Sequence, residues 1–177
     1  ALRKVFGKEY VLPVHQGRAA ENIISQAFIK KGDVIPMNYH FTTTKEHMEI
    51  NGGEILEIFA DEALKIRSDH PFKGNIDIDK LRGVIREYGP EHVPFVRMEA
   101  STNLIGGQPF SMANMREVKK VADEHGIMVV LDASLIGENA YFIRQRENGY
   151  QDVSIGEILR QMCDMADIVY FSSRKVR

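Results

Sequence analysis

Two side chains that can hold and activate a ring-shaped cofactor follow two apolar runs of the sequence. Asp132 ends the run over 127–131, and Lys175 comes shortly after the run over 168–171. A lysine can bind an aldehyde as a Schiff base, and a carboxylate can keep a pyridine nitrogen protonated so that the ring accepts electrons. Pyridoxal phosphate sites need this pair of residues, and its position after two strand-like runs predicts such a site.

The segment His15-Gln16-Gly17-Arg18 precedes an expected helix and has the features of an anion site. The unpaired N–H groups at a helix start attract negative charge, Gly17 lets the backbone come close, and Arg18 can donate a forked pair of hydrogen bonds. Ser172 and Ser173 can add hydroxyl groups. The alternative interpretation is that Arg18 is a solvated surface charge and that the glycine and serines only form turns.

Two further residues have the chemistry to contact a planar ring. Phe41, which opens the segment Phe41-Thr42-Thr43-Thr44, can lie flat on the ring, and Asn103 can donate its amide to a ring oxygen. The alternatives are a core phenylalanine followed by β-prone threonines, and a turn asparagine. Asp132 lies at the end of a buried strand, where its carboxylate needs a compensating partner or a function, although such residues often cap the next helix. The histidines have no tight metal-binding spacing, so no metal site is expected.

The elements that must position these residues alternate between extended apolar segments and amphipathic helical segments. Helices are predicted over 18–30, 79–88, 111–125, 137–148 and 154–166, and strands over 34–38, 54–59, 93–99, 127–132 and 167–171. A capping box of Ser154 and Glu157 starts the last helix. The alternation predicts an α/β fold with a mostly parallel sheet flanked by helices, in which ligands bind beyond the carboxyl ends of the strands.

Composition narrows the class of protein further. The chain has 177 residues, of which 44% are hydrophobic, enough for one α/β core, and its formal charge of -2 gives no general attraction to nucleic acid. No apolar stretch approaches the roughly 18 residues of a membrane span, and 1–4 lacks the apolar core of a secretory signal. Cys163 lies among apolar residues, which predicts a buried thiol and fits a reducing cytoplasm.

Several longer strings resemble the β-eliminating lyase family, which includes tyrosine phenol-lyase and tryptophan indole-lyase. The strings cover nearly the whole chain and are found at 15–18, 41–44, 103 with 106–114, 132, 138–143 and 172–175. The resemblance implies the large domain of a fold-type I enzyme, similar to aspartate aminotransferase. It also implies that 1–177 is an incomplete cofactor-binding domain, with the N-terminal arm and the C-terminal small domain absent.

The resemblance also assigns a role to each matched residue. It implies that the cofactor phosphate is held by Gln16, Gly17, Arg18 and Ser172. Phe41 would stack on the ring, Asn103 would meet its 3-oxygen, Asp132 would pair with the pyridine nitrogen, and Lys175 would form the Schiff base. The family further implies a small amino-acid substrate, a homo-oligomer arranged as a dimer of dimers, and a monovalent cation whose ligands cannot be identified in this sequence.

Two positions bear on the substrate. Thr42 resembles the threonine of tyrosine phenol-lyase, where tryptophan indole-lyase has an aspartate, and Leu135 replaces an arginine of the family beside the 3-oxygen. The expected function is therefore β-elimination of a tyrosine- or tryptophan-type amino acid to pyruvate and ammonia. Three alternatives stay open: elimination of a thiol from a cysteine-like substrate, an aminotransferase on the same fold, and a non-catalytic paralogue.

Overall fold

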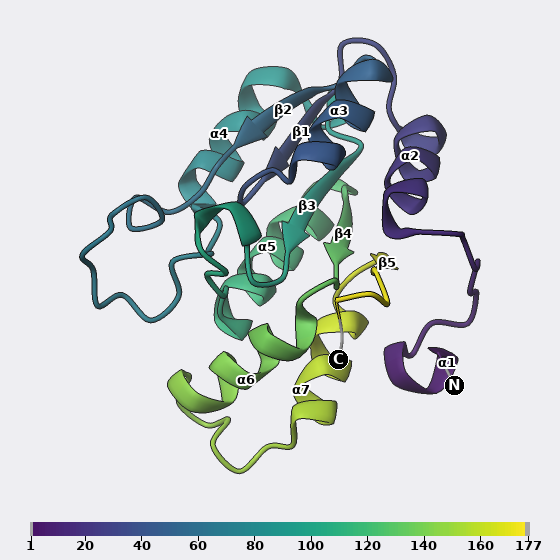
Figure 1. The fold of residues 1–177 in the computed structure, drawn as a ribbon. Coiled ribbons are helices and arrows are strands. Elements are labelled where there is room, and N and C mark those ends of the chain that lie inside the picture. Colours follow the sequence, from purple (N-terminus) through teal and green to yellow (C-terminus); the bar gives the residue numbers. More distant parts are fainter. Residues whose placement is uncertain (1, 176–177) are drawn as a thin grey trace.

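The fold is a five-stranded parallel sheet with helices on both faces (Figure 1). The computed structural model describes residues 2–175. The strands lie in the order β2-β1-β3-β4-β5. They span, in chain order, β1 Val34–Met37, β2 Glu54–Glu57, β3 Phe95–Glu99, β4 Met128–Asp132 and β5 Ile168–Tyr170. The prediction of a mostly parallel sheet flanked by helices is confirmed.

Each of the five predicted helices is present, with ends that differ by a few residues from the predicted ones. The α-helices are α1 Leu2–Phe6, α2 Gly17–Phe28, α3 Thr42–Ile50, α4 Ile78–Tyr88, α5 Met112–His125, α6 Ile136–Arg146 and α7 Ile155–Asp164, and two short 3-10 helices are η1 Pro90–His92 and η2 Asn103–Ile105. The hydroxyl of Ser154 caps α7 by accepting the N–H of Glu157 at 3.2 Å. The helices α1 and α3 were not predicted.

The helix α3 is the more instructive omission, because it contains the threonine run. β-Branched residues lose side-chain freedom in a helix, so three successive threonines argue against one. Here Thr43 and Thr44 donate their hydroxyls to the Glu21 carboxylate of α2 at 2.7 and 2.8 Å. Met48, one turn after Thr44, is buried. The interpretation of these threonines as a β-prone segment is therefore wrong, because contacts with α2 outweigh local propensity.

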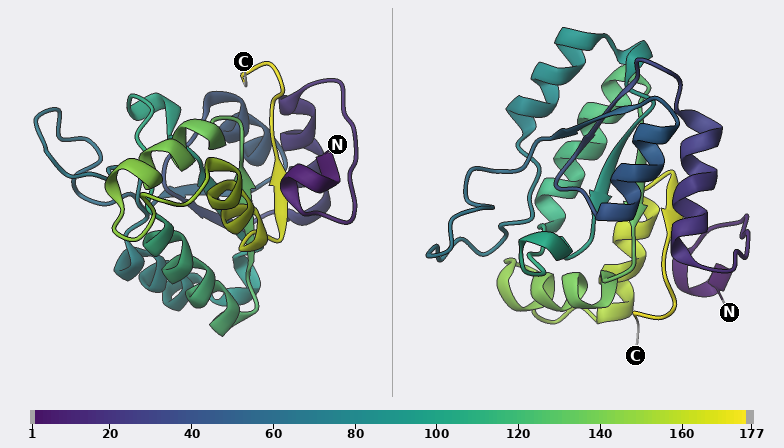
Figure 2. Two further views of the ribbon diagram at one scale, coloured as in Figure 1. Left: turned by 90° about the horizontal axis from the view of Figure 1, so that it is seen from below. Right: turned by 45° about the horizontal axis from the view of Figure 1, so that its top comes forward.

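The two faces of the sheet are covered by different helices (Figure 2). Because successive strand residues point to opposite faces, Phe95 of β3 packs in a cluster with α2 and α3, whereas Val96 and Met98 pack in a cluster with α4, α5, α6 and α7. The second cluster is the larger one and forms the main core. Cys163 is fully buried in it, and burial raises the pKa of its thiol to about 11, which confirms the predicted buried thiol.

The carboxyl ends of the parallel strands meet at one edge of the sheet, and the segments after them carry the predicted site residues. Phe41 follows β1, Asn103 follows β3 and Lys175 follows β5, while Asp132 is the last residue of β4. The start of α2 lies at the same edge, since Gly17 approaches Ser172. The fold thus gathers segments that are far apart in the sequence.

Candidate active site

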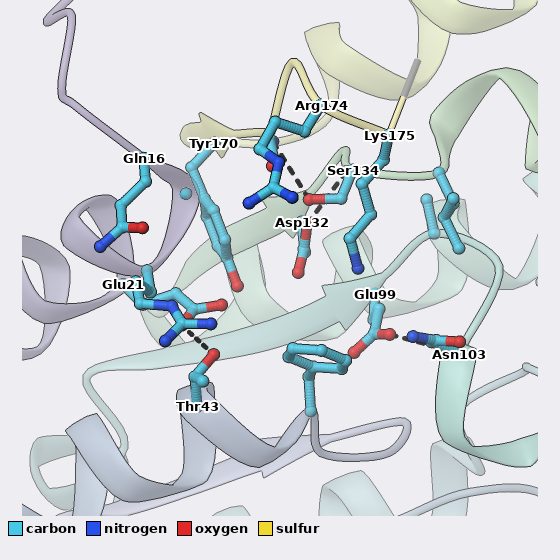
Figure 3. Close-up of a pocket in the computed structure, with 16 residues that line it drawn as sticks. Gln16, Glu21, Thr43, Glu99, Asn103, Asp132, Ser134, Tyr170, Arg174 and Lys175 are labelled. Atoms are coloured by element: carbon cyan, nitrogen blue, oxygen red, sulfur yellow. Dashed lines mark hydrogen bonds between the residues drawn. The ribbon is translucent and has the colours of Figure 1, made fainter. Parts of the chain in front are cut away.

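A pocket of about 320 Å³ lies at this edge of the sheet (Figure 3). Its lining includes every residue to which the family resemblance assigns a role in cofactor binding: Gln16, Gly17, Arg18, Phe41, Asn103, Asp132, Ser172 and Lys175. Ser173, which was also considered as a hydroxyl donor, is not among the lining residues. Thr42, the predicted substrate residue, is exposed at the start of α3 and is not among the lining residues, whereas Thr43 is. The volume lies in the range of small-ligand sites.

The lysine and the aromatic ring meet inside this pocket. Lys175 Nζ lies 4.7 Å from the centroid of the Phe41 ring. Lys175 is held in a turn, in which its backbone N–H donates to the carbonyl of Ser172 at 3.1 Å. Phe41 is fixed as the N-cap residue of α3. An amine and an aromatic face therefore lie close together at the ends of two strands.

The N-terminus of α2 forms one end of the pocket. Gln16 is the N-cap residue of α2, and its side chain makes no capping hydrogen bond. A Cβ added at Gly17 would lie 3.1 Å from the Cβ of Ser172, so glycine permits the close approach of these two segments. Arg18 also lines the pocket. The helix N–H groups, a hydroxyl and a guanidinium together have the donor chemistry of a phosphate site.

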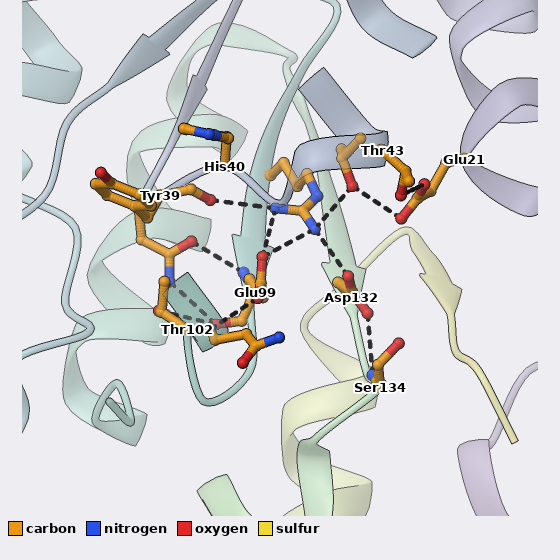
Figure 4. Close-up of polar contacts among 12 residues, drawn as sticks. Glu21, Tyr39, His40, Thr43, Glu99, Thr102, Asp132 and Ser134 are labelled. Atoms are coloured by element: carbon orange, nitrogen blue, oxygen red, sulfur yellow. Dashed lines mark hydrogen bonds and ion pairs between the residues drawn. The ribbon is translucent and has the colours of Figure 1, made fainter. Parts of the chain in front are cut away.

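Asp132 is buried at the floor of the pocket and has a charged partner (Figure 4). Its Oδ2 accepts a hydrogen bond from Arg97 Nη2 at 2.7 Å, and its Oδ1 accepts the N–H of Ser134 at 3.0 Å. It is not the N-cap of α6, which is Leu135. The carboxylate is therefore held in one orientation by both of its oxygens, and the helix-cap alternative does not hold.

The charged residues of β3 were not predicted as site residues. Glu99 lines the pocket and is buried, and burial raises its pKa above the ordinary value. Arg97 is fully buried beside it. The signal was present, because two charged residues at alternate positions of an otherwise apolar strand must lie on one face and need partners there. Leu135 lines the pocket, as its expected position beside the 3-oxygen requires, and further lining residues that were not predicted are Glu21, Thr43, Ala100, Ser134, Tyr170 and Arg174.

The loop after β3 is held by buried side chains that position Asn103. The Asn38 amide donates to the carbonyl of Glu99 at 3.1 Å, and its oxygen accepts the N–H of Glu99 at 3.0 Å. Ser101 has a φ of 53°, a left-handed conformation that costs a residue with a Cβ some strain. The N–H of Asn103 then donates to Glu99 Oε1 at 2.9 Å. Asn103 and Glu99 are therefore positioned together.

The residues that the structure describes contain neither a cluster of metal ligands nor a membrane-spanning helix. Within 2–175, no three His, Cys, Asp or Glu side chains gather as metal ligands. In the same range, no helix has the length and apolar character needed to cross a membrane.

The sequence of the chain matches a known protein family. Residues 1–176 match the β-eliminating lyase family, and the chain belongs to that family. It is 47% identical over 175 residues to the tyrosine phenol-lyase of Symbiobacterium sp. (strain SC-1), covering 99% of this chain and 38% of the relative. It is 48% identical over 174 residues to the tyrosine phenol-lyase of Pasteurella multocida (strain Pm70), covering 98% and 38%. The chain thus spans 38% of the length of these curated relatives.

Solved structures support the fold. A putative aromatic amino acid beta-eliminating lyase/threonine aldolase from Exiguobacterium sp. 255-15 superposes with a TM-score of 0.63 at 15% identity, covering 96% of this chain and 42% of that one. A putative L-allo-threonine aldolase from Listeria monocytogenes EGD-E gives a TM-score of 0.64 at 20% identity, covering 96% and 41%. The predicted fold-type I architecture is therefore confirmed.

Proposed function

We propose that this chain is the cofactor-binding part of a pyridoxal phosphate-dependent carbon–carbon lyase. The reaction would be β-elimination of a tyrosine- or tryptophan-type amino acid to pyruvate and ammonia. The observation that carries the proposal is the position of Lys175 Nζ over the Phe41 ring, in a pocket with Asp132 at its floor. Family membership supports the reaction class, and the tyrosine phenol-lyase relatives favour tyrosine as the substrate.

The lining residues fit pyridoxal phosphate in three parts. Gln16, Gly17, Arg18 and Ser172 offer the donors for the phosphate, and Gly17 allows a close approach to Ser172 that any Cβ at this position would crowd. Phe41 would cover one face of the ring, while Asn103 would donate to the ring oxygen. The cofactor, when bound, supplies an electron-accepting ring.

The remaining steps belong to the residues of this chain. Asp132 would hold a proton at the pyridine nitrogen, because its carboxylate is fixed in place at the pocket floor. Lys175 would hold the cofactor through its Nζ and would take the α-proton of the substrate as a general base.

A second candidate reaction is elimination of a thiol from a cysteine-like substrate. It is favoured by Leu135, which lines the pocket where the family resemblance implies an arginine. Pyruvate release from tyrosine, tryptophan and S-alkylcysteine, assayed in parallel, separates these substrates. Pyruvate formed without a keto-acid co-substrate argues against an aminotransferase.

Three other properties complete the proposal. The cofactor-binding domain continues in a longer protein, the full protein is a dimer of dimers, and it works in the cytoplasm. A monovalent cation, to which no residue of this chain is assigned as a ligand, belongs to the same proposal. Light scattering measures the mass of the purified full-length protein in solution. The mass of a monomer would contradict the proposed dimer of dimers.

The cofactor proposal is tested by covalent trapping. The full-length protein purified with pyridoxal phosphate is expected to have a yellow absorption band, and borohydride reduction should attach the cofactor to Lys175. Peptide mapping is unambiguous locally because the preceding residue, Arg174, cannot form a Schiff base. Lys119 and Lys120 on α5 serve as internal controls. A main adduct on either of them contradicts the assignment of Lys175.

A further inference from the structure

Three residues form a row across the ends of β3, β4 and β5. In the parallel register, Glu99 pairs with Asp132, and Asp132 pairs with Tyr170. Register partners on neighbouring strands point to the same face. All three side chains are buried and all three line the pocket. The row therefore forms the floor of the pocket on the α2 side of the sheet.

Arg97 lies two residues before Glu99 on β3, on the same face and directly behind this row. Its Nη2 donates to Asp132 Oδ2 at 2.7 Å, and both Nη1 and Nη2 donate to Glu99 Oε2 at 3.2 Å. Its Nε donates to the Tyr170 hydroxyl at 2.9 Å. One guanidinium thus contacts every member of the row, including the Glu99 and Asp132 carboxylates that are labelled in Figure 4.

The charges of this cluster do not cancel. Burial disfavours the Arg97 charge, yet contacts with Tyr170, Glu99 and Asp132 raise the pKa of Arg97 above its ordinary value, so the charge is retained. Burial likewise raises the pKa of Tyr170, which keeps that hydroxyl neutral at pH 7. One cation and two carboxylates leave an excess of one negative charge when both carboxylates are ionised. An uncompensated buried charge is costly, so a cation in the pocket would stabilise it.

Glu99 is placed to share that cation with Asp132. Its Oε2 is bound by Arg97, and its Oε1, which accepts the N–H of Asn103, lies at the pocket. Asp132 by itself would be a weak partner for a pyridinium, because its charge is already compensated by Arg97 at 2.7 Å. The second carboxylate restores the missing negative charge.

Building on the proposed function, we propose that Glu99 is a second cofactor-facing carboxylate. In this arrangement Arg97 is a positioning residue that cancels one of the two carboxylate charges. The floor of the pocket then presents one net negative charge, which matches one protonated pyridine nitrogen. The charged or titratable groups around Glu99 are Arg97 on β3, Asp132 on β4, Tyr170 on β5 and Lys175 after β5, and the Thr44 hydroxyl links Arg97 to the more distant Glu21 of α2. The count takes only Arg97, Glu99 and Asp132, because Tyr170 is neutral, Lys175 would be bonded to the cofactor and Glu21 makes no direct contact with the row.

The test is the protonation of the ring nitrogen in the full-length protein. The protein is loaded with pyridoxal phosphate labelled with ¹⁵N in the ring, and the ¹⁵N chemical shift is followed against pH. Glu99→Gln leaves one cation against one carboxylate, so the pH at which the ring nitrogen loses its proton should fall by about one unit or more. Adding Arg97→Gln to Glu99→Gln leaves Asp132 uncompensated again and should restore the protonated ring.

Two controls separate charge from structure. Glu21→Gln neutralises another buried pocket carboxylate, which binds Thr43 and Thr44 and makes no direct hydrogen bond to Arg97, and it should move the ring signal much less than Glu99→Gln does. Glu99→Asp keeps the charge and should keep the ring protonated. The comparison of Glu99→Gln with Glu99→Asp decides the question even if the Arg97→Gln/Glu99→Gln protein does not fold.

The inference fails if Glu99→Gln gives the same ring signal as Glu21→Gln. It also fails if the folded double variant stays deprotonated, because rescue by removal of the opposite charge is not expected of a purely structural residue. Failure of the proposed function looks different. In that case the unmodified protein itself forms no borohydride-fixable bond between pyridoxal phosphate and Lys175.

Discussion

The two faces of the sheet use the same strands for different purposes. On the α5 side, Val96, Met98, Val129 and Leu131 are buried and apolar along the whole length of β3 and β4. On the α2 side, the apolar residues Phe95 of β3 and Met128 and Val130 of β4 come first, and the charged residues Arg97, Glu99 and Asp132 follow at the carboxyl ends. Neighbouring residues of one strand therefore serve either the core or the site. Stability and chemistry should be separable by changing adjacent positions.

The comparison also shows what each face requires. The apolar face gains free energy from burial alone, and its residues tolerate change in proportion to the volume that is lost. The charged end of the other face depends on pairing, because a buried charge without a partner costs several kcal/mol. A substitution on the apolar face should lower stability in proportion to the volume that it removes. A substitution at the charged end of the other face should have an effect that depends on the charge that it adds or removes.

The largest expected effect on stability comes from the apolar face. Leu131 is fully buried and directly precedes Asp132. Leu131→Ala should lower the free energy of unfolding by about 2–5 kcal/mol, since it removes buried methyl groups and leaves a cavity. Urea unfolding of the full-length protein measures this loss. The folded fraction should keep the absorption band of the bound cofactor, and a lost band in folded protein would contradict the separation of the faces.

The next effect concerns the adjacent residue on the other face. Asp132→Asn should leave the cofactor bound but reduce exchange of the substrate α-proton by about 10²–10³-fold, because a neutral amide cannot hold the pyridine nitrogen protonated. Exchange in deuterated water is followed by NMR, with Leu131→Ala as the matched control on the other face. Exchange at the unmodified rate means that the ring is not the electron acceptor proposed here.

The two faces were not equally accessible to prediction from the sequence. The apolar runs of β3 and β4 predicted both strands, and the family resemblance indicated that Asp132, Lys175 and Phe41 surround one cofactor. Arg97 and Glu99 were missed because their partners lie on β4 and β5 and on the loop after β3, which strand periodicity does not reveal. The helical state of Thr42–Ile50 was missed for a similar reason, since Glu21 of α2 binds its threonines.

A smaller effect is expected from the thiol in the main core. Burial raises the pKa of Cys163 to about 11. A raised pKa means that stability is fully present below the ordinary thiol pKa of about 8.5 and is lost as the pH rises through about 11. The loss should reach about 2 kcal/mol at pH 10. Unfolding measured between pH 7 and 10 should show this slope, and Cys163→Ala should lack it. Equal slopes for the two proteins would mean that ionisation of the Cys163 thiol does not contribute to the pH dependence of stability.

The smallest expected effect concerns Leu135, which lines the pocket just after β4 where the family resemblance implies an arginine. A cation beside the ring's 3-oxygen favours the ionised oxygen and so lowers the pH at which the bond between Lys175 and the cofactor loses its proton. Leu135→Arg should therefore shift the spectral titration of the full-length protein by about one pH unit to lower pH.

Leu135→Gln is the matched control for this last substitution, because it adds a polar group of moderate length without a charge. Its titration should stay where that of the unmodified protein lies. Leu135 is only half-buried and faces the pocket, so a guanidinium at this position has access to solvent and to the cofactor and need not be buried unpaired. A soluble, cofactor-bound Leu135→Arg protein with an unchanged titration would mean that the position has no influence on the ring. The charge at the pocket floor would then be set by Arg97, Glu99 and Asp132.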